Sequence, residues 1–114
     1  MQNKNVDEMS GYIIDEMCVY FKNRVKDFII KDLIDNVNHK SFSIEFSAYE
    51  YFPIIFNYDM GKIGYNICFG TRIISLENSQ KWWDEADFNK LFHELKEALE
   101  LRIPDKYLQL NGWL

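Results

Sequence analysis

Cysteine and histidine are scarce in this chain, which has two of each. Cys18 and Cys68 lie far apart in apolar surroundings and form no CxxC pair, so sulfur and imidazole ligands are too few for a zinc site. We expect both thiols to be free and buried, as is typical of a reducing compartment. No metal ion or other cofactor is predicted.

Long apolar runs are missing as well. The first eight residues are polar and acidic and contain no apolar signal core. No later run approaches the roughly 20 apolar residues that a membrane-spanning helix needs. We therefore expect a cytoplasmic protein without membrane association.

Positive charge is in deficit, with 13 basic against 18 acidic residues and a formal net charge of −5. A protein that binds a phosphate backbone needs a basic patch, so nucleic acid is not an expected partner. The acidic balance is compatible with a basic protein partner, and equally with a role in solubility alone.

Catalytic signatures are absent too, so no enzymatic activity is predicted. His93 is followed by Glu94 but lacks the second histidine of a zinc-protease helix, and His39 is far away in the sequence. The stretch Gly61–Gly64 lacks the spacing and the Ser or Thr of a phosphate loop. A deep pocket that joined His93, Glu45 or a cysteine would instead indicate an unfamiliar enzyme.

Apolar spacing predicts helices at both ends of the chain. From Val6 to Val37 apolar residues recur every three to five positions, which predicts one long N-terminal helix. A second stripe between Phe88 and Leu99 follows a cluster of acids that suits a helix N-terminus. Pro104 ends that helix and begins a short one that reaches Leu110.

Between these helices, residues 41–76 alternate apolar and polar side chains with the period of a half-buried strand. Gly61 suits the tight turn of a hairpin over residues 59–62. The pattern predicts a three- to four-stranded antiparallel meander. We expect one α+β domain over residues 1–114, with the helices packed on one face of the sheet.

Aromatic residues are plentiful: nine Phe, seven Tyr and three Trp. They bunch with acids at residues 49–52 and 82–85, where neighbours along an extended chain point in opposite directions. Some rings are therefore expected on the surface, where Tyr and Trp anchor protein partners and acids pair with basic groups, although core packing explains many aromatics. The predicted partner-binding residues are Glu45, Tyr49, Glu50, Tyr51, Asp59, Trp82, Trp83, Asp84, Glu85 and Asp87.

The C-terminal run Leu101–Leu108, followed by Gly112-Trp113, is similar to the tails of small immunity proteins. In size, acidity, aromatic content and lack of catalytic motifs, the chain resembles the immunity proteins of bacterial contact-dependent growth inhibition. The resemblance implies a protein that binds a cognate toxin, in many cases a nuclease with a basic groove, and blocks its active site or an adjacent surface. It implies no binding residue by position.

A different class of function stays open. The chain is also compatible with a small adaptor or regulatory domain that binds a host-cell protein or forms a homodimer. The first or last strand of the predicted sheet offers an edge that can pair with another chain.

Overall fold

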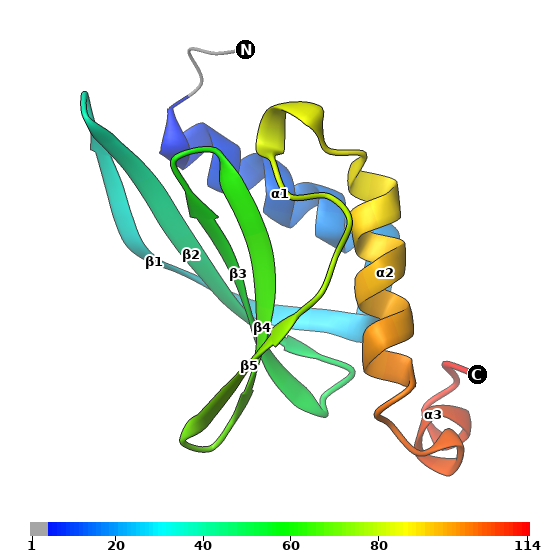
Figure 1. The fold of residues 1–114 in the computed structure, drawn as a ribbon. Coiled ribbons are helices and arrows are strands. Elements are labelled where there is room, and N and C mark those ends of the chain that lie inside the picture. Colours follow the sequence, from blue (N-terminus) through cyan, green and yellow to red (C-terminus); the bar gives the residue numbers. More distant parts are fainter. Residues whose placement is uncertain (1–4) are drawn as a thin grey trace.

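One helix comes first along the chain, five strands follow, and two helices come last (Figure 1). The computed structural model describes residues 5–114. The elements are α1 (Val6–Phe21), the 3-10 turn η1 (Lys22–Arg24), β1 (Val25–Asn36), β2 (His39–Ala48), β3 (Phe52–Asp59), β4 (Lys62–Phe69), β5 (Arg72–Leu76), the 3-10 turn η2 (Trp83–Glu85), α2 (Phe88–Glu100) and α3 (Asp105–Leu110). The predicted α+β class is confirmed, and the sheet has five strands where three or four were expected.

The prediction of one helix from Val6 to Val37 is wrong beyond Phe21. The Asn5 side chain caps the start of α1, and the positive φ of 55° at Lys22 breaks its end. Residues 25–36 form the first strand of the sheet.

Two β-bulges explain why this strand has the spacing of a helix. The pairing of β1 with β2 shifts register twice, and each shift contains an aspartate with positive φ, Asp27 at 62° and Asp32 at 53°. Each bulge adds one residue to β1. On the face of the sheet that the helices cover, successive side chains of β1 are therefore two or three positions apart, whereas a regular strand would space them by two. These side chains are Val25, Phe28, Ile30 and Leu33. Their spacing therefore imitates an apolar helical stripe.

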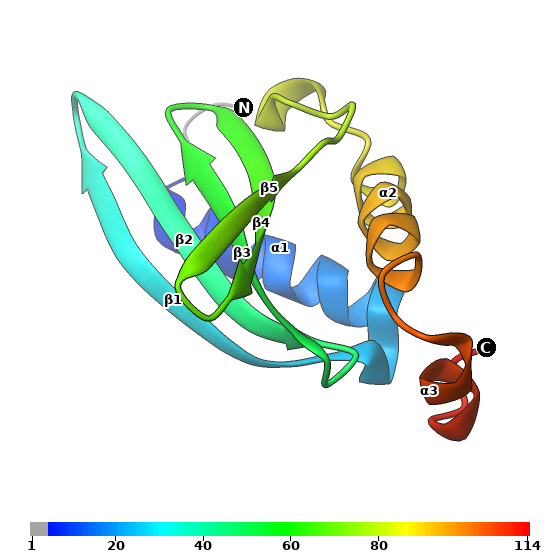
Figure 2. The ribbon, with the colours of Figure 1, turned by 60° about the horizontal axis from the view of Figure 1, so that its bottom comes forward.

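The five strands lie in chain order and every neighbouring pair is antiparallel, as a meander requires (Figure 2). The predicted turn between β3 and β4 is confirmed: Met60 and Gly61 have φ of 51° and 94°. Positive φ at both central residues matches the right-handed twist of a hairpin, and glycine adopts it without strain.

Alternate residues of β2, β3 and β4 face the core, as the period of two predicted. On β2, Phe42, Ile44 and Phe46 are fully buried, whereas Ser43 and Glu45 between them stay partly exposed. No helix of the described chain covers that second face, which we call the open face.

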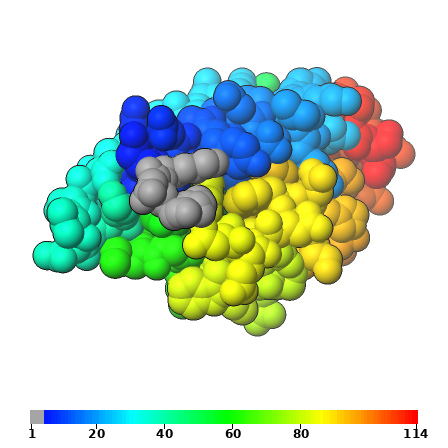
Figure 3. Space-filling view, turned by 90° about the horizontal axis from the view of Figure 1, so that it is seen from above, coloured from blue at the N-terminus to red at the C-terminus, as the bar shows by residue number. Residues whose placement is uncertain are grey.

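Both long helices cover the other face, as expected (Figures 1 and 2). Aromatic rings join the helices, since Tyr12 lies 6.0 Å from Phe88 and Tyr20 lies 5.5 Å from Phe92 between ring centroids. Seen from above, α1 lies beside the segment that leads into α2, and the tip of the β1–β2 hairpin projects away from both (Figure 3). Within residues 5–114, no helix is both long enough and apolar enough to span a bilayer.

Candidate functional site

The open face carries a shallow groove of about 500 Å³ at the end of the sheet near the β2–β3 turn. β1, β2, the turn and the start of β3 form its walls. Its charged lining consists of one lysine, Lys26, and three carboxylates, Asp27, Glu45 and Glu50. The ring of Tyr51 lies at the rim. The groove thus brings together Glu45, Glu50 and Tyr51, three of the predicted partner-binding residues.

Two of these carboxylates already face lysines across the surface. Lys26 Nζ lies 3.0 Å from Glu50 Oε2, and Lys31 Nζ lies 3.1 Å from Glu45 Oε1. The hydrogen bond from Lys26 to Glu50 raises the pKa of that lysine. All four side chains are at least one third exposed, and such pairs contribute little to stability because water screens them. A guanidinium from a partner, which binds a carboxylate through two parallel bonds, can therefore displace a lysine.

The rim of the groove is a turn with a strained backbone. Tyr49 and Glu50 have φ of 59° and 48°, and the Tyr51 N–H donates to the Ala48 carbonyl at 3.0 Å. This is the geometry of a type I′ turn, which normally uses Asn and Gly. A bulky residue at positive φ costs on the order of 1 kcal/mol and persists only where the surroundings hold it.

Tyr49 is the residue that holds this turn, and it is fully buried. Its hydroxyl donates to Glu100 at 2.6 Å, and its carbonyl accepts from the Tyr107 hydroxyl at 2.8 Å. Its ring lies edge-on to Trp113, at 5.4 Å between centroids. Burial raises the pKa of the Tyr49 phenol far above its usual value, and the bond to Glu100 raises it further. The prediction that Tyr49 contacts a partner is wrong, because the side chain is an internal anchor.

The second predicted cluster lies at the opposite end of the sheet, beside the β3–β4 turn. Trp82 is half exposed and covers Gly61, with a ring carbon 3.7 Å from where a glycine Cβ would be. Asp84 and Glu85 are exposed near it, and Asp59 lies in the same hairpin and pairs with a histidine. These residues do not join the groove, since the length of β3 separates the two ends.

Two further predicted residues have structural roles. Trp83 is buried and contacts the rings of Tyr58 and Phe88, so its assignment to a partner surface is wrong. Asp87 is the N-cap of α2, and its carboxylate accepts from the Lys90 N–H at 3.2 Å. Because that role occupies the carboxylate within the chain, helix capping explains Asp87 without a partner.

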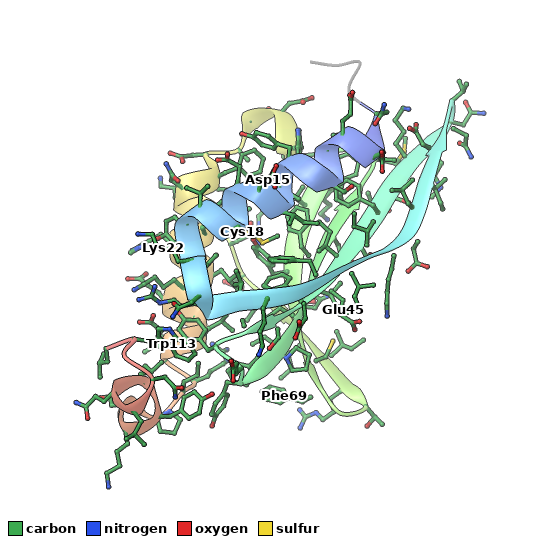
Figure 4. The ribbon with its side chains drawn as sticks, turned by 180° about the vertical axis from the view of Figure 1, so that it is seen from behind. Asp15, Cys18, Lys22, Glu45, Phe69 and Trp113 are labelled. Atoms are coloured by element: carbon green, nitrogen blue, oxygen red, sulfur yellow. The ribbon has the colours of Figure 1, made fainter. Side chains whose placement is uncertain are left out.

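The residues that would indicate an enzyme do not converge. His93 lies on α2, within 3.3 Å of Glu97, whereas Glu45 lies on the open face of the sheet. Cys18 is exposed on α1 (Figure 4), which corrects the expectation that it is buried. Cys68 is partly exposed on β4. Within residues 5–114, no three His, Cys, Asp or Glu side chains are close enough to share a metal ion.

The His39–Asp59 pair resembles part of a catalytic relay. His39 Nε2 lies 2.9 Å from Asp59 Oδ1, and Ser41 is the cross-strand neighbour of that aspartate. Both members of the pair are exposed at the edge of a second hollow of about 330 Å³. A relay needs a base that is oriented and shielded from water, and this surface pair lacks such shielding.

Sequence reasoning missed the β1 wall of the groove, which consists of Lys26, Asp27 and Ile29. The signal that could have found it is a repeat of five residues, Val-Lys-Asp-Phe-Ile followed by Ile-Lys-Asp-Leu-Ile over residues 25–34. Five is no helical period, whereas aspartate tolerates the positive φ of a bulge and Val and Ile favour strands.

Comparison with known proteins returned no match among protein-family models, curated proteins or solved structures.

Proposed function

We propose that this protein is an immunity protein, which binds a cognate toxin domain through the groove on the open face and blocks the toxin's active site or an adjacent surface. The observation that carries the proposal is the groove itself, whose lining holds three carboxylates and one lysine beside apolar residues such as Ile29 and Pro53. The protein performs no chemistry of its own in this proposal. A basic partner, such as a nuclease with a positive substrate groove, fits this charge.

The rigidity of the rim supports the same function. A turn that keeps Tyr49 and Glu50 at positive φ presents Glu50 and Tyr51 in one arrangement before any partner arrives. Binding then costs less conformational entropy, because these contact residues of the chain are already ordered. Backbone strain retained on a surface is typical of binding and catalytic sites.

The charges of the groove support fast association with a basic toxin. Carboxylates in a concave surface attract a basic partner over a distance comparable to the Debye length, about 8 Å at physiological salt. Rapid capture suits a protein that must neutralise a toxin before it acts. The complex should accordingly associate more slowly as salt is added.

The proposed function predicts a toxin gene adjacent to the gene for this chain, and the product of that gene is the partner for the test. We expect the two proteins to co-purify and cells expressing the toxin to survive only when this chain is present. Glu45→Lys combined with Glu50→Lys should weaken binding about tenfold or more, since each interfacial charge pair contributes on the order of 1.5 kcal/mol. A chain that neither binds nor protects overturns the proposed function.

A matched control reverses two acids at the other end of the sheet. Asp84→Lys with Glu85→Lys makes the same change in net charge outside the groove. We expect this variant to bind and protect like the parent chain. If it loses binding while the groove variant keeps it, the interface lies beside the β3–β4 turn and the groove assignment is wrong. Thermal unfolding of both variants checks that each is folded.

The adaptor alternative has one observation in its favour, the exposed apolar side chains along β1. An adaptor binds through such an edge without any neighbouring toxin gene. Protection of toxin-expressing cells separates the two functions, because an adaptor gives none.

A further inference from the structure

β1 lies at the edge of the sheet and pairs only with β2 in the described part of the chain. In Figure 4 it crosses the front of the molecule between α1 and Glu45. Ile29, Ile30 and Leu33 along it are 51%, 40% and 41% exposed. A long edge strand with exposed apolar side chains is a template for another strand.

The five-residue repeat determines which side chains each face of this edge presents. Ile29 pairs with Glu45 and Lys31 with Ser43, so both lie on the open face, and Lys26, Asp27 and Asp32 line hollows of that same face. Phe28 stacks on Phe46 and Ile30 pairs with Ile44, so both lie on the helix-covered face. The open face of the edge therefore carries two Lys-Asp pairs on either side of one isoleucine.

We propose that two copies of this chain pair antiparallel through β1, about a two-fold axis at Ile29. In this register Lys26 of each copy lies opposite Asp32 of the other, and Asp27 lies opposite Lys31. Ile29 meets Ile29 on the open face, and Phe28 meets Ile30 on the other. All seven positions from residue 26 to 32 then match in charge or in apolar character, and cross-strand pairs of both kinds stabilise a sheet.

Neighbouring registers lack this match. A two-fold axis at Phe28 puts Lys26 opposite Ile30, and an axis at Ile30 puts Lys26 opposite Ile34. Each mixes a charge with an apolar side chain, and each also puts some side chains of the open face opposite side chains of the helix-covered face. The pairing that satisfies charge and face together is the one centred on Ile29.

The aspartates supply a reason for the second copy. Within residues 5–114, neither Asp27 nor Asp32 lies within 4 Å of a cationic group of its own chain. In the dimer each gains a lysine of the other copy. The paired strands alone bury less than the 1,200 Å² or so of a standard stable interface, so we expect a weak, concentration-dependent dimer.

Sedimentation equilibrium of the full chain at roughly 10 to 500 µM tests the pairing, a range in which weak complexes dissociate. We expect a monomer–dimer equilibrium that Ile29→Lys weakens about tenfold or more, because two lysines would then meet at the axis. The matched control is Ile73→Lys, which places the same charge on the more exposed Ile73 of the opposite edge strand, β5. A chain that stays monomeric throughout, or a dimer that is sensitive only to Ile73→Lys, overturns the proposal.

Disulfide cross-linking tests the register itself. In a Cys18→Ser, Cys68→Ser background, Ile29→Cys puts two thiols directly opposite each other, within reach of a disulfide after a small adjustment. Lys31→Cys puts its two thiols four residue steps apart along the paired strands, roughly 13 Å, which no disulfide spans. We expect oxidation to link the first variant and not the second. Equal cross-linking of both, or of neither, contradicts the register.

Discussion

The Tyr49 hydroxyl donates a 2.6 Å hydrogen bond to the carboxylate of Glu100 and so ties the β2–β3 turn to the last turn of α2. Hydrogen bonds to charged groups contribute about 1.5–3 kcal/mol each. Tyr49→Phe removes this bond and leaves a partly buried carboxylate with the Lys96 ammonium, 3.4 Å away, as its remaining partner. We expect the free energy of unfolding to fall by about 1.5–3 kcal/mol in urea denaturation. Tyr51→Phe, the same change on an exposed ring, should alter it by less than about 0.5 kcal/mol.

The strained backbone at the rim of the groove leads to a second prediction. Glu50→Ala and Glu50→Gly both remove the carboxylate, but only glycine relieves the positive φ of 48°. We expect the glycine variant to be more stable than the alanine variant by about 1 kcal/mol, measured by denaturant unfolding. Equal stability would mean that the turn carries no strain. Both variants should bind the toxin more weakly than the parent, because both lack the Glu50 charge.

Alkaline unfolding reports on the buried phenols. Burial raises the pKa of Tyr65 far above its ordinary value near 10. The folded chain therefore keeps this proton when the unfolded chain has lost it, so stability is full below about pH 10 and falls as pH rises further. Tyr65→Phe should reduce the slope above pH 10 by up to about 1.4 kcal/mol per pH unit. Within residues 5–114 the hydrogen-bond partner of this hydroxyl is the weak acceptor Met17 Sδ, at 3.6 Å, so the change should cost little at pH 7.

The exposed thiol of Cys18 is expected to react slowly. Partial burial raises the pKa of this thiol, and the Asp15 carboxylate one turn earlier raises it further. In a Cys68→Ser background, alkylation by iodoacetamide at pH 8 should be slower than that of a free cysteine and should still accelerate above pH 9. Asp15→Asn should speed the reaction about twofold, since the thiolate is the reacting form. Glu8→Gln, at the start of the same helix, is the control and should change nothing.

Most of the fold follows from periodicity. Residues 41–76 alternate with a period of two and form strands, and the stripe between Phe88 and Leu99 forms α2. The strand 25–36 was missed because bulges at Asp27 and Asp32 give its apolar side chains helical spacing. The positive φ at these two aspartates depends on the pairing of β1 with β2, which is a tertiary interaction that local sequence does not reveal.

The candidate site was predictable only in part. Aromatic and acidic clustering selected Glu50 and Tyr51, which line the groove together with Glu45, a predicted acid outside that cluster. It also selected Tyr49 and Trp83, whose side chains turn inward. The direction of the Tyr49 side chain could not be known beforehand, because a turn with two residues at positive φ changes the alternation that an extended chain would have. Trp83 lies in the 3-10 turn η2, where that alternation does not hold either.

The anchoring of Tyr49 also constrains the order in which this protein folds. Tyr49 and Glu100 are separated by 51 positions, Tyr107 and Tyr49 by 58, and Trp113 and its hydrogen-bond partner Asn23 by 90. Contacts between such distant positions form slowly, because long loops must close first. The hairpins of the sheet can form early from local contacts. The contacts of Tyr49 can form only after α2 and the C-terminal residues have docked. We expect the groove to be among the last parts of the molecule to acquire its final shape, and among the first to lose it.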